Sequence, residues 1–184
     1  MDFDVHRFIK RARRKPLWTP AETTQEVELG RPEIERVLPH RPPMLFVDRI
    51  SAVDLAQEAA RGHRTLDPAD PLFGGHFPDY PVYPGALLVE TMGQLAICLH
   101  HLLIHERVTV LPEDTPPPVR LLRLHHALFL AEALPGDELT LLDVRLDADD
   151  YTMICGAQAL KGDQIVCAAV MEVYLPEGGD LGGG

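Results

Sequence analysis

The sequence has few cysteines, and their spacing excludes two common cysteine frameworks. Cys98, Cys155 and Cys167 are the three cysteines among 184 residues, and no two of them form a C-x-x-C pair. An odd number of widely spaced cysteines builds neither a disulfide scaffold nor a zinc ribbon. We therefore expect free thiols and a reducing, cytoplasmic environment.

Basic residues are also in the minority, which limits the kinds of partner. The formal net charge is −11, and this argues against general binding to nucleic acid or to an anionic membrane. The first 15 residues are an exception, because they carry six Lys or Arg against two Asp. We interpret residues 1–31 as an N-terminal basic arm, either a solvated segment or a docking patch for an acidic partner.

Long apolar runs are a further absence. The basic N-terminus lacks the apolar core of about 7–15 residues that marks a secretory signal. We also expect no apolar run of the roughly 20 residues that a membrane span needs. The remaining chain is long enough for one domain with a sizeable core, which we place at residues 32–176. The Gly-rich residues 177–184 are expected to form a flexible tail.

Hydrophobic periodicity predicts one long buried helix followed by consecutive strands. Residues 85–106 carry apolar side chains at helical spacing and on nearly all sides, which is typical of a helix inside a protein. From residue 119 onward the period changes to two, which predicts strands over 119–131, 138–147, 151–160 and 164–175. A short helix over 32–38 and an earlier strand over 44–50, resuming through 56–65, precede the long helix.

The short breaks between the later strands indicate how they pair. A parallel crossover needs a dozen or more residues, so strands separated by only three to six residues should be antiparallel neighbours. An antiparallel sheet must cover its apolar face. The simplest solution wraps the sheet around the helix, and the predicted fold class is α+β.

One loop carries residues suited to chemistry. His76 lies in the segment 75–85, where three prolines stiffen the backbone. Glu90 follows about 7–8 Å along the next helix. An imidazole is a base that is largely neutral at pH 7, and a carboxylate in an apolar helix is costly unless it has a function. The N–H groups at the helix start, Gly85 especially, are free donors.

Three motifs in this order resemble the bacterial 3-hydroxyacyl-[acyl carrier protein] dehydratases of the FabZ/FabA type, closer to the FabZ branch. They are LPHRPPMLFVDR at 38–49, GHFPDYPVYPG at 75–85 and ETMGQ at 90–94. The resemblance covers residues 32–176 and implies a hot-dog fold, in which an antiparallel sheet wraps around one long central helix. Asp79 and Tyr83 depart from the glycine and methionine usual in the family, which puts substrate shape in question more than chemistry.

The resemblance also implies an activity, namely dehydration of 3-hydroxyacyl thioesters to trans-2-enoyl thioesters in fatty acid or related acyl-chain biosynthesis. It implies that His76 is the base, that Glu90 acts on the 3-hydroxyl and that the Gly85 N–H binds the thioester carbonyl. No metal and no cofactor are expected. The remaining substrate contacts are expected from Gln94, Phe77, Pro84 and Tyr83.

The same resemblance implies partners. One is an acyl carrier protein bearing the substrate. Another is a second copy of the chain, because the family pairs His76 of one protomer with Glu90 of the other, and some members assemble further into trimers of dimers. The carrier is acidic, so Arg120, Arg123 or the basic arm could dock it.

Two alternatives of other classes stay open, a hot-dog acyl thioesterase and a non-catalytic acyl-carrier binding subunit. Thioesterases of this fold typically use a helix carboxylate without a His-Phe-Pro loop. Non-catalytic subunits tend to lose one member of the His/Glu pair, and this chain has both.

Other polar residues receive plainer interpretations. His40 and Arg41 are expected to fix their loop rather than to do chemistry, and Asp48 could pair with Arg49. His101 and His105 have the i, i+4 spacing of metal ligands. The sequence shows no third ligand beyond His100, so no metal site is predicted.

Overall fold

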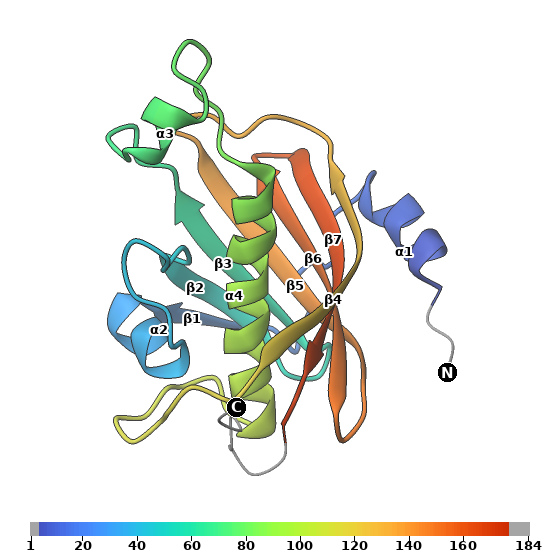
Figure 1. Ribbon diagram of the computed structural model, residues 1–184. Helices are drawn as coiled ribbons and strands as arrows, with labels where there is room; N and C mark the ends of the chain where they lie inside the picture. Colours follow the sequence, from blue (N-terminus) through green and yellow to red (C-terminus); the bar gives the residue numbers. More distant parts are fainter. Residues whose placement is uncertain (1–3, 177–184) are drawn as a thin grey trace.

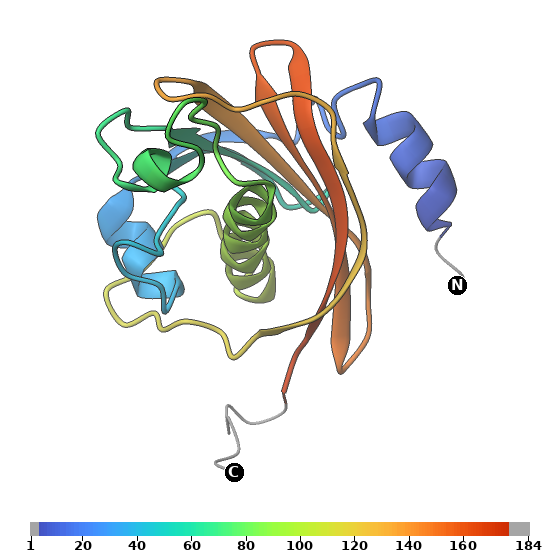
Figure 2. The ribbon, with the colours of Figure 1, turned by 45° about the horizontal axis from the view of Figure 1, so that its top comes forward.

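The computed structural model describes residues 4–176, and a single antiparallel sheet wrapped around one long helix dominates it (Figure 1). The sheet order is β1-β2-β3-β5-β6-β7-β4. Seen along the central helix α4 (Gly85–Ile104), the sheet curves around it (Figure 2). The predicted fold class and arrangement are confirmed. The strands are β1 (Gln25–Leu29), β2 (Arg49–Asp54), β3 (Ala59–Thr65), β4 (Arg120–Phe129), β5 (Glu138–Ala148), β6 (Thr152–Lys161) and β7 (Gln164–Tyr174).

The four later strands lie where the alternating pattern predicts them. Short turns join the last three, which pair as antiparallel neighbours as predicted, whereas β4 pairs with β7 and not with its successor β5. Lys161 pairs with Gln164 across the β6–β7 hairpin, leaving a two-residue turn. Gly162 in that turn has φ of 55°, a conformation that glycine adopts without steric cost.

The predicted strand over 44–50 is wrong for its first part, since β2 begins at Arg49. Residues 44–47 form a loop whose apolar side chains Leu45, Phe46 and Val47 are buried. The backbone of this loop bonds to a side chain of α4 instead of a neighbouring strand: Phe46 N donates to Gln94 Oε1 at 2.8 Å. The apolar run therefore reports burial correctly but not strand pairing.

Helix α4 forms the centre of the core, and Leu88, Met92, Leu95, Leu99 and Leu102 on it are almost completely buried. By length and composition α4 is apolar enough to cross a membrane, contrary to the expectation that no run reaches that length. However, 67% of its apolar window is buried inside the protein. The sheet supplies the apolar surroundings that a membrane would otherwise provide.

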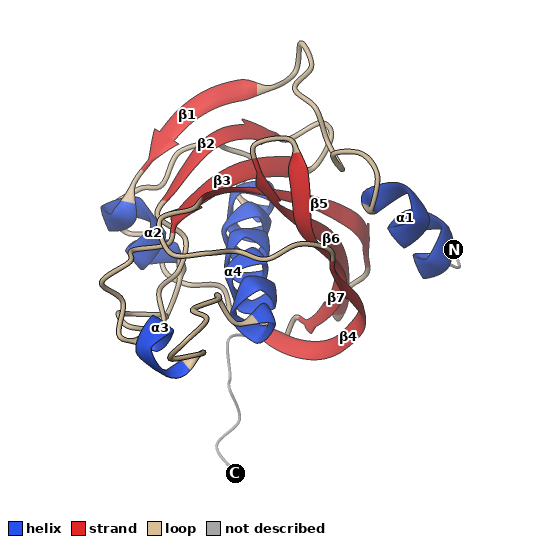
Figure 3. Cartoon of the chain, turned by 90° about the horizontal axis from the view of Figure 1, so that it is seen from above, coloured by secondary structure: helices blue, strands red, loops and turns tan. Residues whose placement is uncertain are grey.

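The N-terminal segment contributes two elements that the sequence did not predict as part of the domain (Figure 3). Strand β1 pairs with β2 at one edge of the sheet. Helix α1 (Val5–Ala12), capped by the Asp4 side chain, packs Ile9 and Ala12 against Ala168 and Val170 on the outer face. Only a few apolar residues make these contacts, so hydrophobic patterning gave little signal. Residues 177–184, the expected tail, lie outside the described residues.

The remaining helices are short and bracket the loops of the site. Helix α2 (Arg31–Val37), the predicted short helix, buries Ile34 and Val37. Helix α3 (Leu72–Gly75) is a single turn that ends at His76.

Candidate active site

His76 is held at the end of α3 by its own backbone and ring. Its N–H donates to Leu72 O at 3.1 Å, and Val82 N donates back to His76 O at 2.9 Å. The ring atom Nδ1 lies 2.8 Å from Val82 O. Because a carbonyl oxygen only accepts, Nδ1 carries the proton and Nε2 of the neutral ring is left with a lone pair. The ring stacks on Phe77, with 4.1 Å between centroids, and Phe77 is about half exposed. The loop thus presents an oriented base.

Tyr83 anchors the loop from the inside. Its ring is 3% exposed and packs between Phe46 and Phe73, while its N–H donates to Ala133 O at 2.7 Å. Burial raises the pKa of the phenol. The structure therefore places Tyr83 behind the loop, where it shapes the site instead of facing solvent. Pro84 follows as the residue that caps α4.

The start of α4 offers free backbone donors. Leu87 N and Leu88 N both donate to Pro84 O. Within residues 4–176, neither Gly85 N nor Ala86 N donates to a protein acceptor. The Phe129 ring lies over Gly85, and a Cβ added there would be 2.7 Å from Phe129 Cε1. A side chain at this position would require the Phe129 ring to move, and the positive end of the helix dipole faces this side.

Glu90 lies between two polar partners of its own chain. Its Oε1 accepts from Gln94 Nε2 at 2.8 Å and lies 3.3 Å from His40 Nε2. Gln94 is completely buried, accepts from Phe46 N and donates to Met44 O at 2.8 Å. Both amide protons of Gln94 are therefore used, one of them on Glu90. Gln94 orients the carboxylate, as the i, i+4 spacing predicted.

His40 is the residue whose place in the site sequence reasoning missed. We interpreted it as fixing its loop, yet its imidazole lies beside Glu90. Arg41 does fix the loop, because its Nη1 donates to Leu38 O at 2.9 Å and to His40 O at 2.6 Å. The available signal was the motif itself, which places a histidine in a rigid loop. The expected pairing of Asp48 with Arg49 is also wrong.

The carboxylate of Asp48 instead joins segments that lie far apart in sequence. It lies 2.6 Å from Arg31 and 3.4 Å from Arg64, and accepts from Thr65 N. This network fixes the end of β3 against α2, next to the loop that carries Phe46.

A cavity of about 160 Å³ adjoins Glu90 between α4 and strands β6 and β7. Its polar side chains are His40 and Glu90. The rest of the lining is apolar, with Val89, Ala96, Ile97, Val119, Leu121, Cys155, Met171 and Val173 around Gly93. Such a cavity accepts an apolar chain with a polar group beside the carboxylate.

The structure does not join the two predicted catalytic residues within one chain. Among the described residues, no hydrogen bond or ion pair links His76 to Glu90. His76, Phe77 and Gly85 gather at the loop and the helix start, whereas Glu90, Gln94 and His40 gather beside the cavity.

Fold and site together define a class of protein, the hot-dog dehydratases and their relatives. The dehydratase heterocomplex ApeI:P from Xenorhabdus doucetiae superposes with a TM-score of 0.59 at 15% identity, over 80% of this chain and 93% of that one. The uncharacterized protein PH1136 from Pyrococcus horikoshii superposes with a TM-score of 0.51 at 13% identity, over 87% of this chain and 96% of that one. At these identities the likeness establishes the fold.

Sequence comparison gives the family. Residues 38–170 match the FabA-like domain, and the chain belongs to that family. The 3-hydroxyacyl-[acyl-carrier-protein] dehydratase FabZ of Xylella fastidiosa (strain 9a5c) is 32% identical over 156 residues, which cover 83% of this chain and 93% of that protein. The FabZ of Bacillus velezensis is 33% identical over 146 residues, or 79% of this chain and 96% of that protein.

Proposed function

We propose that this protein removes water from 3-hydroxyacyl thioesters carried on acyl carrier protein, giving trans-2-enoyl thioesters in fatty acid biosynthesis. Family membership and relatives named FabZ over most of the chain support the activity. The observation that carries the assignment to this site is the presence of both parts of an acid–base pair. His76 has an oriented ring whose Nε2 is left as the acceptor nitrogen in the neutral tautomer, and Glu90 is held by Gln94 beside an apolar cavity.

The chemistry divides between these groups. His76 Nε2 takes the proton from C2, and the electrons of that bond form the new double bond as the C3–O bond breaks. Glu90 donates a proton to the departing hydroxyl, which leaves as water. Negative charge that develops on the thioester oxygen is stabilised by the free Gly85 N–H at the helix start. The Glu90 carboxylate and the His76 imidazolium then exchange protons with solvent, and the site is restored.

Two copies of the chain form the proposed active unit. Strand β4 is a sheet edge, paired with β7 alone, and Leu121, Leu122, Leu124 and Phe129 on it are 44–61% exposed. An unprotected apolar edge is a template for pairing with another chain. Leu121 also lines the cavity beside Glu90, so an interface on β4 is continuous with the site. In this dimer His76 of one protomer works with Glu90 of the other, and three such dimers can assemble into a trimer of dimers.

The carrier protein is the proposed macromolecular partner, acting in the cytoplasm. The arm presents a basic face on α1 and the residues that follow it: Arg7, Lys10, Arg11, Arg14 and Lys15 surround a surface hollow. This face complements an acidic carrier. Arg120 and Arg123 at the β4 edge are a second exposed basic pair. The acyl chain, anchored by its thioester near Gly85, extends into the apolar cavity.

The experiment uses His76→Ala and Glu90→Gln, separately and mixed, with mass spectrometry of 3-hydroxyacyl carrier protein as the assay. Each single variant should lose activity by roughly 10²–10⁴-fold. Mixing by co-expression should restore about a quarter of wild-type activity. Half of a random mixture is heterodimer, and each heterodimer has one intact site. His6→Ala, an exposed histidine on α1, is the matched control.

The outcomes separate the alternatives. Full activity in either single variant contradicts the assignment. Lost activity without restoration on mixing contradicts the shared site but not the reaction. Release of free thiol instead of an enoyl product favours a thioesterase, and binding of the acyl carrier without turnover favours a non-catalytic subunit.

A further inference from the structure

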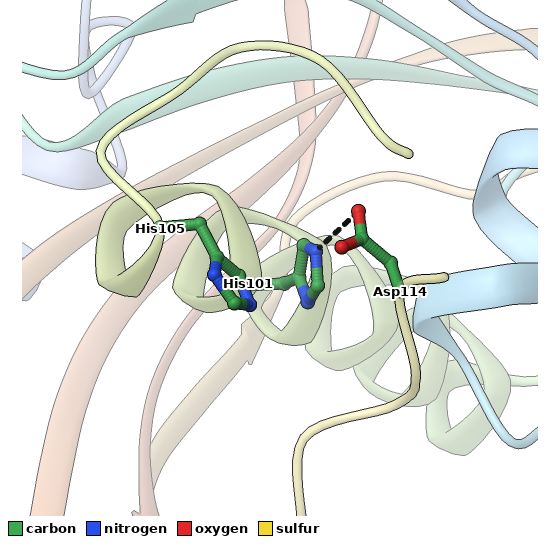
Figure 4. Close-up of side chains that lie close together, drawn as sticks. All are labelled: His101, His105 and Asp114. Carbon is green, nitrogen blue, oxygen red and sulfur yellow. Dashed lines mark ion pairs between the residues drawn. The ribbon is translucent and has the colours of Figure 1, made fainter. Parts of the chain in front are cut away.

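The last turn of α4 brings together a second cluster of polar side chains, separate from the Glu90 site. His101 lies 11 residues beyond Glu90, about 16 Å along the helix axis. His101 and His105 face Asp114, which comes from the segment between α4 and β4 (Figure 4). We propose that His101, His105 and Asp114 bind a divalent transition-metal ion of the Zn²⁺ type, which fastens the 106–118 segment to the end of α4.

The spacing of the ligand atoms suits such an ion. One ligand atom from each residue lies within 4.8 Å of the other two, and His101 Nε2 is 3.2 Å from Asp114 Oδ2. Around a tetrahedral zinc with bonds of about 2.0–2.1 Å, ligand atoms lie about 3.3 Å apart. The His101–Asp114 edge already has this length. To reach this spacing, the ligand nitrogen of His105 must move by at most ~1.5 Å. Its ring is free to do so because His105 is exposed.

His101 is a buried side chain aimed into this cluster, and its one polar contact there is with Asp114. It is 1% exposed, and neither ring nitrogen makes a hydrogen bond within the described part of the chain. The contact of Nε2 with Asp114 Oδ2 is close enough for an ion pair but does not meet hydrogen-bond geometry. Buried polar atoms normally have partners. A metal placed between Nε2 and Oδ2 satisfies the nitrogen without needing that alignment.

Asp114 is held ready as a ligand. Its side chain is 5% exposed, and its Oδ2 accepts from Leu111 N at 2.7 Å. Its Oδ1 pairs with Arg107, so the oxygen nearest His101 is not the one on the guanidinium. Carboxylates that ligate metals are themselves hydrogen-bonded. Arg107 offsets part of the negative charge, so we expect weaker binding than at closed sites with four protein ligands.

The ligand types select the ion. Two imidazoles and one carboxylate suit Zn²⁺, Co²⁺ or Ni²⁺, whereas Mg²⁺ and Ca²⁺ prefer oxygen ligands alone. Water completes the coordination. The fastened segment leads directly into Val119 and Leu121, which line the cavity beside Glu90. The ion would thus fix the entry of β4 and act as a structural tether.

The test is zinc binding by untagged, chelator-treated full-length protein, followed by calorimetry and by the visible absorption of Co²⁺. The wild type should bind one ion per chain. His105→Ala should weaken binding at least tenfold, and because His105 is exposed the variant should fold. Saturating zinc should raise the unfolding temperature of the wild type but not that of His105→Ala. His6→Ala, another exposed histidine, should bind as the wild type does.

Asp114→Asn is a second variant that should also weaken binding, although it disturbs the Arg107 pair as well. The proposal is overturned if the wild type shows no saturable binding, or if His105→Ala leaves stoichiometry and affinity unchanged.

Discussion

Asp143 is the group whose ionisation should be most visible in the stability of this protein. It lies on β5, is completely buried, and neither carboxylate oxygen has a hydrogen-bond partner within residues 4–176. Burial raises its pKa well above the ordinary 3.8. The folded state therefore holds this proton more tightly than the unfolded chain does. The stabilising effect is complete below the unfolded pKa and is lost as pH rises toward the folded pKa.

The size of the effect follows from linkage. One proton bound by the folded state alone makes the free energy of unfolding fall by at most about 1.4 kcal/mol per pH unit. Between about pH 4 and pH 7 this amounts to as much as about 4 kcal/mol, if Asp143 stays protonated throughout. Asp143→Asn keeps the shape of the side chain and removes the titration. Its amide, also unpartnered, adds a cost that does not depend on pH.

The assay is urea unfolding followed by circular dichroism, at fixed protein concentration and at several pH values. As pH rises, the unfolding free energy of the wild type should fall relative to that of Asp143→Asn. Cys155, a neighbour on β6 whose pKa is raised well above its usual value by burial and by Asp143, stays a neutral thiol over this range. Asp147→Asn removes an exposed carboxylate from the same strand and is the matched control. Parallel curves for Asp143→Asn and wild type would refute the reasoning.

Two further changes test the supports of the site. Gln94→Leu should lower the unfolding free energy, measured by urea unfolding, by about 1–3 kcal/mol, because it leaves the buried Phe46 N–H without an acceptor. It should also lower kcat, measured by steady-state kinetics, because Glu90 loses its orienting donor. An unchanged kcat would contradict the orienting role. Gly85→Ala should lower kcat/KM about tenfold by placing a methyl group where the thioester approaches the backbone. Its stability should change by less than about 1 kcal/mol, since the half-exposed Phe129 ring can turn away, and wild-type kcat/KM would contradict the role of the Gly85 N–H.

The fold was predictable where its determinants are local. Alternation over 138–147 and 164–175, short turns and an all-round apolar helix fix β5, β7 and α4 almost to the residue. The loop at residues 44–47 shows the limit. Its buried apolar side chains look like a strand, but its backbone partner is the Gln94 side chain, 48 residues away from Phe46. Periodicity reports which side chains are buried and says little about which group satisfies the backbone.

The N-terminal segment shows a related limit. Gln158 of β6 donates to Ala12 O and Lys15 O and accepts from Leu17 N, which ties the end of α1 to the sheet. A single buried glutamine makes these contacts across more than 140 residues of sequence. No pattern within residues 1–31 could reveal a partner located on β6.

In both sites, local spacing predicted the contacts within α4 but not those made by distant segments. Helical spacing made the contact of Gln94 with Glu90 predictable, and it made the pairing of His101 with His105 visible. The third metal ligand was not visible, because the proline-rich residues 107–118 indicate an exposed linker. Asp114 is nevertheless nearly buried, since the Leu111 N–H and the Arg107 guanidinium hold it against the helix end. The 107–118 segment is folded, because the Asp114 carboxylate contacts both the backbone of the segment and His101 of α4. This folding brings the three proposed ligands together.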